Sequence, residues 1–248
     1  MKQLEITEQY SELLQIDLLE VFNKFRNKSV NASYSDREDR NRFAAEYIIN
    51  YQFDNILNVG GGGQRHLEKQ ISNLGSKKKI FEIDMEGEAD LTLNMDKIDK
   101  LPFSNEAFDI CCAFDVLEHL ENFHLVNNEL FRVSKNFVLI SLPNSAFEIF
   151  PNVFKNNPQQ RPDMNRGTYS KYYGIPLQIP NDRHRWWLYF FDIIRFYYWF
   201  SLNNKCNIEF FIPNNKGSYI MQALETLNPF LYHTFFVPHV WIKLIKNN

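Results

Sequence analysis

The chain has 248 residues and a formal net charge of −3, and 44% of its residues are hydrophobic. This length suits one α/β domain with additions. A nucleic-acid-binding domain usually carries a strong basic bias, which this chain lacks, so we expect no nucleic-acid partner. The three cysteines include one adjacent pair and no CxxC, which argues against a disulfide framework and fits a reducing compartment.

The hydropathy pattern predicts no membrane segment. The N-terminal stretch MKQLEITEQYSEL carries charges where a signal peptide needs an apolar run. The longest aromatic and aliphatic run, 186–200, is interrupted by Asp192 and Arg195 and is shorter than the ~20 residues that a membrane helix needs. We therefore expect a cytoplasmic protein without a transmembrane segment.

Two helices are expected before the first strand. Apolar residues between positions 8 and 26 recur at helical spacing. The sequence SDRE, which begins at Ser35, has the form of a capping box and predicts a second helix that runs to about Tyr51. Both helices are expected to pack beside the ligand cleft.

From residue 55 onward, short apolar runs alternate with helical patterns. The runs predicted as strands are 55–59, 79–84, 91–93, 108–114 and 136–141. Because parallel strands need crossover connections, this alternation predicts a parallel, doubly wound α/β sheet. Further on, the sequence predicts an irregular cap over 144–182, an aromatic helix over 186–202, and two final strands over 207–213 and 237–246.

The first predicted strand runs into four consecutive glycines, Gly60–Gly63. Glycines let the backbone approach a ligand closely because no Cβ intrudes, although glycine clusters also make plain turns. Asp84 ends the next strand, where a carboxylate can accept both hydroxyls of a ribose. Asp96 follows the third strand, where it could accept the exocyclic amine of adenine. A solvated strand-end acid and a surface-turn acid are the alternatives for these two residues.

The order of these motifs resembles that of the class I S-adenosylmethionine-dependent methyltransferases. ILNVGGGGQ is similar to their first strand and glycine loop, FEIDM to the strand that ends in the ribose-binding acid, and LNMD to the adenine-side acid. LPFSNEAFDICCAFDVLEHL is similar to their LPF…FD…VLEH segment, and SLPN to the end of their fifth strand. The resemblance covers about residues 54–145, with the motifs in the family's order.

This resemblance implies a Rossmann-like class I methyltransferase fold, which is a mostly parallel, doubly wound seven-stranded sheet. N-terminal helices would precede it, and an aromatic-rich cap would follow strand 5. We divide the chain into N-terminal helices (1–53), a cofactor-binding core (54–145), a cap with the aromatic helix (146–204) and C-terminal strands that complete the sheet (205–248). The implied cofactor is S-adenosyl-L-methionine, whose cationic sulfur carries an activated methyl group.

The resemblance also implies a set of cofactor contacts. They are Asn58, Gly60, Gly62, Asp84, Met85, Asp96, Phe114 and Asp115. Gly60 and Gly62 would lie against the methionine and ribose portions, and Phe114 and Asp115 beside the methionine and the reactive sulfonium.

Two positions depart from the family pattern. The family usually has an acid where Asn58 stands and a glycine where Gln64 stands. The Asn58 amide can still supply a side-chain oxygen to the methionine amino group or to the loop. The Gln64 side chain narrows the space in which the cofactor can approach the backbone at the end of the glycine loop.

Methyl transfer to a hydroxyl also needs a group that removes the proton. His119 and His184 are the candidate bases, because imidazole titrates near neutral pH. Asp115, Glu118 and His119 form a D-x-x-E-H string, which is similar to the E-x-x-E-H metal-binding string of ubiquinone-biosynthesis O-methyltransferases and small-RNA terminal 2′-O-methyltransferases. His184 could be a further ligand. Many metal-free relatives also carry LEH, so a structural pair is favoured over a divalent metal.

The segment 180–187, PNDRHRWW, resembles a DRHRW stretch of methyltransferases found with bacterial cell-surface glycan synthesis. Arg183 and Arg185 could grip a phosphate or carboxylate, and Trp186 could stack on a sugar ring. Together with Tyr172, they are the predicted acceptor contacts. The alternative is a structural start of the aromatic helix, with Asp182 as its N-cap.

These patterns favour O-methylation of a sugar, a sugar nucleotide or another phosphorylated precursor of a bacterial surface polysaccharide. The expected partner is this small-molecule or glycan-precursor acceptor, and a homodimer stays open. One alternative is a phenolic or quinone-like acceptor, and another is a non-catalytic methyltransferase-like binding subunit. A nicotinamide-dependent oxidoreductase would share the glycine turn and the strand-end acid, but it has no role for the LPF…FD…VLEHL segment.

Overall fold

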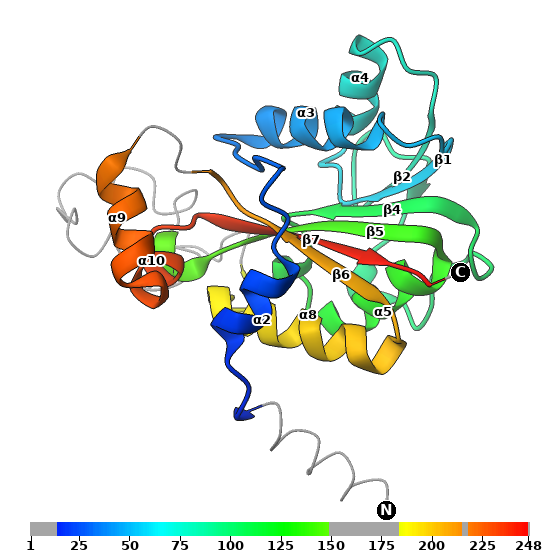
Figure 1. Cartoon of the computed structure of the whole chain (residues 1–248). Coiled ribbons are helices and arrows are strands. Elements are labelled where there is room, and N and C mark those ends of the chain that lie inside the picture. The colour runs from blue at the N-terminus through cyan, green and yellow to red at the C-terminus, as the bar shows by residue number, and fades with distance from the viewer. Residues whose placement is uncertain (1–13, 149–183, 215–217, 248) are drawn as a thin grey trace, which may run out of the picture.

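The computed structural model describes residues 14–148, 184–214 and 218–247. A seven-stranded sheet with the order β3-β2-β1-β4-β5-β7-β6 forms its centre (Figure 1). The strands are β1 (Asn55–Val59), β2 (Lys79–Asp84), β3 (Leu91–Thr92), β4 (Phe108–Phe114), β5 (Ser134–Pro143), β6 (Asn207–Phe211) and β7 (His239–Ile245). The predicted α/β class and the seven predicted strands are confirmed.

Strand direction decides where a ligand site can form. The pairs among β1 to β5 are all parallel, whereas β7 runs antiparallel to both β5 and β6. The carboxyl ends of the five parallel strands therefore meet at one edge, which we call the carboxyl edge. Because His239 pairs with Pro143, β7 begins at this same edge. In doubly wound sheets, ligands bind beyond this edge.

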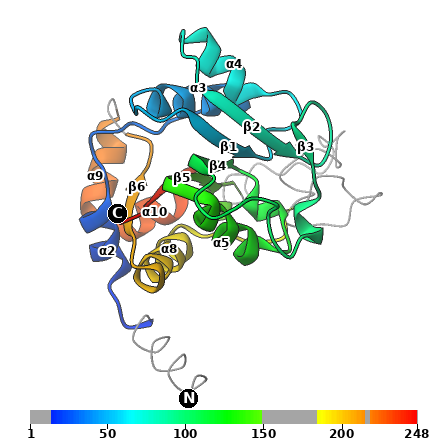
Figure 2. The same ribbon diagram turned by 90° about the vertical axis from the view of Figure 1, so that its right-hand side faces the viewer.

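Helices cover both faces of the sheet (Figures 1 and 2). On one face lie α3 (Arg37–Ile48) and α4 (His66–Asn73), and on the other lie α2 (Leu18–Phe25), α5 (Phe123–Val133) and α8 (Phe190–Asn204). Successive side chains of β4 point to opposite faces of the sheet, so the strand contributes to the cores on both faces. Cys111 and Ala113 pack on the α5–α8 side, whereas Cys112 and Phe114 pack on the α3–α4 side. Both cysteines are buried and free.

Two predicted helix starts were wrong. Helix α3 begins one residue later than the capping box suggests, because the Asp36 side chain caps it by accepting from the Asp39 amide at 2.9 Å. The Ser35 hydroxyl instead donates to the Asp39 carboxylate at 2.6 Å. The aromatic helix, α8, begins only at Phe190, with Tyr189 in the N-cap position. The proposed cap, Asp182, lies outside the described residues.

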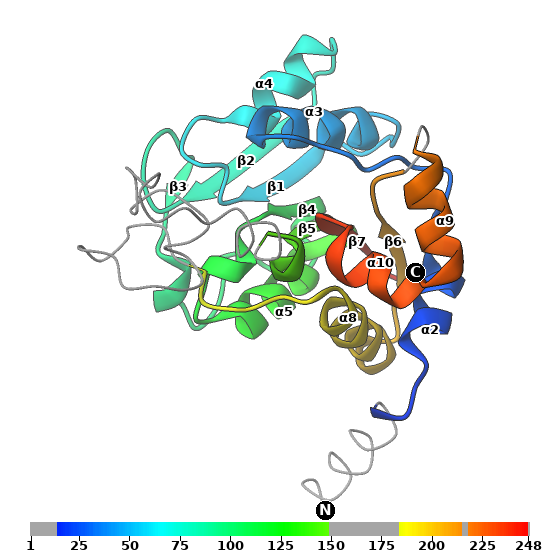
Figure 3. The same cartoon turned by 90° about the vertical axis from the view of Figure 1, so that its left-hand side faces the viewer.

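Two helices between β6 and β7, α9 (Tyr219–Leu227) and α10 (Pro229–Phe235), were not predicted. They lie beside the start of β7 (Figure 3). The Asn144 side chain, just beyond β5, donates to the carbonyls of Thr234 at 2.9 Å and Val237 at 2.8 Å. This anchor ties the end of α10 to the carboxyl edge.

The division of the chain into four parts stays a prediction, and residues 149–183 of the predicted cap lie outside the described range. Among the described residues, no helix has the length and apolar character needed to cross a membrane.

Candidate cofactor and acceptor site

The glycine bend lies at the carboxyl end of β1. Gly60, Gly62 and Gly63 adopt φ angles of 73°, 75° and 63°, a left-handed conformation that strongly favours glycine. The Gly60 amide donates to the Ile83 carbonyl at 2.8 Å, so the bend folds back over the end of β2. The clustered glycines therefore form a built loop at the ligand edge of the sheet.

Asp84 is tied directly to this bend. Its Oδ2 atom accepts from the amides of Gly62 at 2.7 Å and Gly63 at 3.2 Å. Its Oδ1 atom accepts from the Met85 amide at 2.7 Å, and the Met85 side chain is exposed. The two motifs that lie more than twenty residues apart in sequence thus form one unit, which sets a half-buried carboxylate at the rim.

Asp96 lies at the same edge, in the short helix η1 (Met95–Lys97) after β3. The Leu93 amide donates to the Asp84 carbonyl at 2.8 Å, so the chain enters η1 from beside the Asp84 backbone. The Asn122 amide donates to Asp96 Oδ1 at 3.1 Å. The glycine bend, Asp84 and Asp96 therefore follow three adjacent strands at one edge, as a nucleoside ligand requires.

Arg37 is a candidate cofactor residue that the sequence analysis did not single out. It opens α3, and a Cβ atom on Gly62 would come within 2.5 Å of its Nη1 atom. The guanidinium is exposed and has no hydrogen bond or ion pair with other described residues. A cation in the first turn of a helix opposes the helix dipole. An arginine in the first turn of the predicted helix was therefore the signal in the sequence that could have pointed to Arg37 as a ligand-binding residue.

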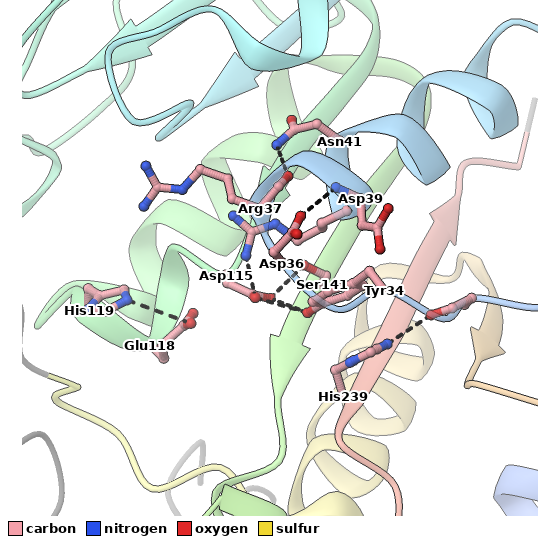
Figure 4. Close-up of polar contacts among 12 residues, drawn as sticks. Tyr34, Asp36, Arg37, Asp39, Asn41, Asp115, Glu118, His119, Ser141 and His239 are labelled. Atoms are coloured by element: carbon pink, nitrogen blue, oxygen red, sulfur yellow. Dashed lines mark hydrogen bonds and ion pairs between the residues drawn. The ribbon is translucent and has the colours of Figure 1, made fainter. Parts of the chain in front are cut away.

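Asp115 lies at the centre of a polar network at the end of β4 (Figure 4). Its carboxylate accepts from the Tyr34 hydroxyl at 2.9 Å and the Ser141 hydroxyl at 2.6 Å, and it pairs with the Arg40 guanidinium. Burial raises the pKa of Asp115, but the Arg40 charge and these hydrogen bonds outweigh burial and hold it below its usual range. Asp115 is therefore ionised, and its carboxylate is occupied by Tyr34, Ser141 and Arg40.

The same network anchors the segment before α3. Burial and the Asp115 charge raise the pKa of Tyr34 well above its ordinary value, so Tyr34 stays a neutral donor. Its ring stacks on His239, with centroids 3.7 Å apart. Nearby, the Phe114 ring packs against Trp241 at 5.1 Å in the core under α3. Residues 32–41 are thus fixed against the carboxyl edge.

A second cluster lies just beyond Asp115. Glu118, His119 and His184 each offer a ligand atom, and these atoms lie within 4.8 Å of one another. His119 Nε2 is 3.7 Å from Glu118 Oε1 (Figure 4), and the two imidazole rings meet edge to face at 4.5 Å. Glu118 and His184 are buried, whereas 26% of the His119 side chain is exposed. This cluster brings both predicted bases together.

Backbone hydrogen bonds hold His184 in place. The helix η2 (Leu117–His119) presents the Glu118 carbonyl, which accepts from the Arg185 amide at 2.7 Å. The Trp186 indole donates to the Leu120 carbonyl at 2.6 Å and its ring packs near Phe123. The Arg185 guanidinium pairs with Glu121 at 2.6 Å. Trp186 therefore has a structural role, whatever the acceptor.

Comparison with known proteins now identifies the fold's family. Residues 57–139 match the family model of a methyltransferase domain. Residues 57–139 therefore carry a methyltransferase domain, and the fold is that of the class I S-adenosylmethionine-dependent methyltransferases. The matched range holds the glycine bend, Asp84, Asp96 and the Glu118–His119 pair. This methyltransferase fold is one that binds S-adenosylmethionine. No curated protein shows a significant sequence match.

Solved structures agree with this fold. The methyltransferase domain of a bacterial CtHen1-C protein has a TM-score of 0.50 and 12% identity, and the match covers 85% of this chain and 98% of that one. An S-adenosylmethionine-dependent methyltransferase from Archaeoglobus fulgidus matches with a TM-score of 0.47 and 13% identity, covering 86% and 95%. The plantazolicin methyltransferase BpumL, bound to S-adenosylhomocysteine, matches with 0.47 and 12%, covering 84% and 82%.

The site residues of the methyltransferase stay predictions at the level of single contacts. The cofactor set, Asn58 to Asp115, lies at or next to the carboxyl ends of β1 to β4. Two predicted acceptor contacts, Tyr172 and Arg183, lie outside the described residues. In the suggested metal string, Asp115 is engaged by Arg40, and His184 joins the other two members instead.

Proposed function

We propose that this methyltransferase transfers a methyl group to a hydroxyl of a saccharide, a sugar nucleotide or another phosphorylated precursor of a surface polysaccharide. The observation that carries this proposal is the cluster of Glu118, His119 and His184 beyond the end of β4. Two imidazoles and a carboxylate suit an acceptor whose proton must be removed, and a sugar hydroxyl is such an acceptor.

In this reaction the acceptor oxygen attacks the methyl carbon, the carbon–sulfur bond breaks, and S-adenosylhomocysteine leaves. The proton of the hydroxyl passes to a base. His119 is the base in this proposal, because its side chain is partly exposed while His184 is buried. Glu118, 3.7 Å from His119, stabilises the imidazolium that forms.

Arg37 and Asp84 hold neighbouring portions of the cofactor in this proposal. Asp84, at the rim of the bend, accepts the ribose hydroxyls. Arg37 lies across Gly62 with its guanidinium unpaired among the described residues, and it binds the α-carboxylate of the methionine portion. A charged hydrogen bond of this kind contributes about 1.5–3 kcal/mol.

The cluster also fits a divalent cation. One carboxylate and two imidazoles within 4.8 Å are the mixed oxygen and nitrogen donors that first-row divalent metals accept. Glu118, His119 and His184 would hold the ion, which would lower the pKa of a bound acceptor hydroxyl. In that case His119 would serve as a ligand of the ion, and another group would remove the proton.

The test combines cofactor binding with methylation of an acceptor panel. S-adenosylhomocysteine binding is measured by calorimetry, and methyl transfer from labelled cofactor is measured on sugar nucleotides, sugar phosphates and catechols. We expect transfer to the sugar compounds only. Transfer to catechols alone would overturn the proposed acceptor class and favour the phenolic alternative.

Variants of the cluster separate binding from chemistry. His119→Ala should reduce turnover about 100-fold or more, the usual contribution of a positioned base, and leave cofactor affinity within twofold. His124→Ala is the matched control, because this exposed histidine packs beside Trp186 outside the cluster. Activity lost in EDTA and restored by Mg²⁺, Mn²⁺ or Zn²⁺ assigns the cluster to a metal, and activity unchanged in EDTA assigns it to base catalysis.

A further inference from the structure

A buried carboxylate lies beneath the glycine bend. Glu82, on β2, is the strand partner of Asn58 on β1, and neither residue is more than 1% exposed. The Asn58 amide donates to Glu82 Oε2 at 3.3 Å. The other oxygen, Oε1, has no hydrogen bond of good geometry from the described residues, although the Arg65 backbone amide lies close enough to lower the pKa of the carboxyl. A buried acid with an unsatisfied oxygen is costly for the fold, so its presence in this place calls for a role.

The unsatisfied oxygen of Glu82 lies against Gly61. A Cβ atom at Gly61 would overlap the carboxylate and come within 2.5 Å of its Cδ atom. Gly61 does not share the positive φ angle of Gly60, Gly62 and Gly63, so its backbone does not require glycine. Glycine at this position therefore serves to leave room for Glu82.

The charges around Glu82 leave it able to respond to a cation. Burial and the Asp84 charge raise its pKa, while the Asn58 hydrogen bond and Arg65 lower it, and the net shift is upward. Arg65 is shared, because its guanidinium also binds Glu68 and Asp90. The carboxylate thus lacks a counter-ion of its own. The cofactor carries two cationic groups, the sulfonium and the α-ammonium.

We propose that Glu82 is a positioning residue for the cofactor, which fixes the Gly60–Gly63 bend from below and supplies the negative charge that faces the cofactor's methionine portion. The resemblance to the class I methyltransferases implies an acid where Asn58 stands on β1. In this chain the amide stands on β1 and the acid on the paired position of β2. The proposal rests on cofactor binding alone and is independent of the acceptor.

An exchange of the two side chains tests this proposal. S-adenosylhomocysteine affinity is measured by calorimetry for the wild type, Glu82→Gln and the double variant Asn58→Asp/Glu82→Gln, with thermal unfolding as a check on folding. We expect Glu82→Gln to weaken binding at least tenfold and to raise the KM for S-adenosylmethionine more than it lowers kcat. The double variant returns the acid to β1 and should recover affinity to within threefold of wild type. Wild-type affinity in Glu82→Gln, or no recovery in the double variant, would overturn the proposal.

A second cycle uses Gly61 and does not depend on the exchange. Gly61→Ala should weaken cofactor binding at least fivefold in the wild type, because the methyl group displaces the Glu82 carboxylate. In the Glu82→Ala background the space is free, so the same substitution should change affinity less than twofold. Equal losses in both backgrounds would show that Gly61 acts without Glu82 and would overturn the proposal. Both the Asn58/Glu82 exchange and the Gly61/Glu82 cycle measure cofactor binding. Their results can therefore be interpreted even if none of the tested acceptors is methylated.

Discussion

Two halves of the carboxyl edge are built in different ways. We call the ends of β1 to β3 the cofactor half, and the ends of β4 and β5, where the proposed acceptor would meet the cofactor's sulfonium beside Asp115, the acceptor half. In the cofactor half, the glycine bend, Asp84 and Asp96 follow β1, β2 and β3 directly and are joined mainly by backbone hydrogen bonds. In the acceptor half, side chains from distant segments converge on the ends of β4 and β5. Tyr34 reaches Asp115 over 81 positions, and Arg40 over 75.

This difference decides what each half depends on. The cofactor half relies on backbone conformation, so glycine and strand order suffice to shape it. The acceptor half relies on buried ionic and hydrogen-bonded side chains, which are stable only when every partner is present. We therefore expect substitutions in the first half to act mainly on cofactor affinity, and those in the second to act on stability and turnover.

The largest expected effect on stability is that of Asp115→Ala. The variant leaves the Arg40 guanidinium, whose side chain is 11% exposed, without its carboxylate. Removing one partner of a buried pair costs about 3–5 kcal/mol. Urea denaturation measures this loss of unfolding free energy.

The matched control is Asp192→Ala, which breaks an exposed pair with Arg195 on α8. Exposed pairs of this kind contribute about 0–1 kcal/mol. Similar losses in the two variants would mean that the Asp115 network does not stabilise the acceptor half more than a surface pair does.

The second prediction concerns the glycine bend and uses two glycines with the same backbone conformation. Gly60 and Gly75 have φ angles of 73° and 74°, so alanine at either position has the same left-handed strain of about 1–2 kcal/mol. At Gly60 the new methyl group would also lie 2.7 Å from Val116 Cγ1, whereas at Gly75 nothing lies within 4 Å. This overlap adds about 1–3 kcal/mol.

Cofactor binding distinguishes the two variants further. Gly60→Ala should weaken S-adenosylhomocysteine affinity at least tenfold, because the bend must shift. Gly75→Ala should leave it unchanged. If Gly75→Ala destabilises the protein as much as Gly60→Ala, backbone strain alone explains the glycine and the contact with Val116 has no effect.

The contrast between the halves also explains what the sequence could predict. The strands and the ligand edge of the sheet were predictable, because local motifs such as the glycine bend and Asp84 act within one strand–loop unit. Tyr34, Arg40 and Ser141 carried no local signal, since their roles appear only when Asp115 is brought to them. Helices α9 and α10 are short and were missed: α9 has no buried residue, and α10 spans only seven residues.

The smallest expected effect is a dependence of stability on pH that originates near the acceptor half. Burial lowers the pKa of His233 and of His239 to about 4. In the unfolded chain both titrate near 6.5. Above this value neither state binds the proton, and stability is unaffected. Below it, the unfolded state binds the proton and the native state does not, so stability falls as pH falls from 6.5 toward 4.

His233→Phe isolates one of these contributions. His233 stacks on Phe190 at 4.8 Å and lies edge-on to Phe22, so a phenyl ring fits its surroundings. Between pH 7 and pH 5.5 the wild type should lose about 1 kcal/mol more unfolding free energy than this variant does, because one buried neutral histidine has been removed. Parallel urea titrations at the two pH values measure the difference, and the exposed His124→Phe serves as the control. If His233→Phe keeps the full wild-type pH dependence, the loss of stability in acid originates from another group. His239, which stacks on Tyr34, would then be the next residue to substitute.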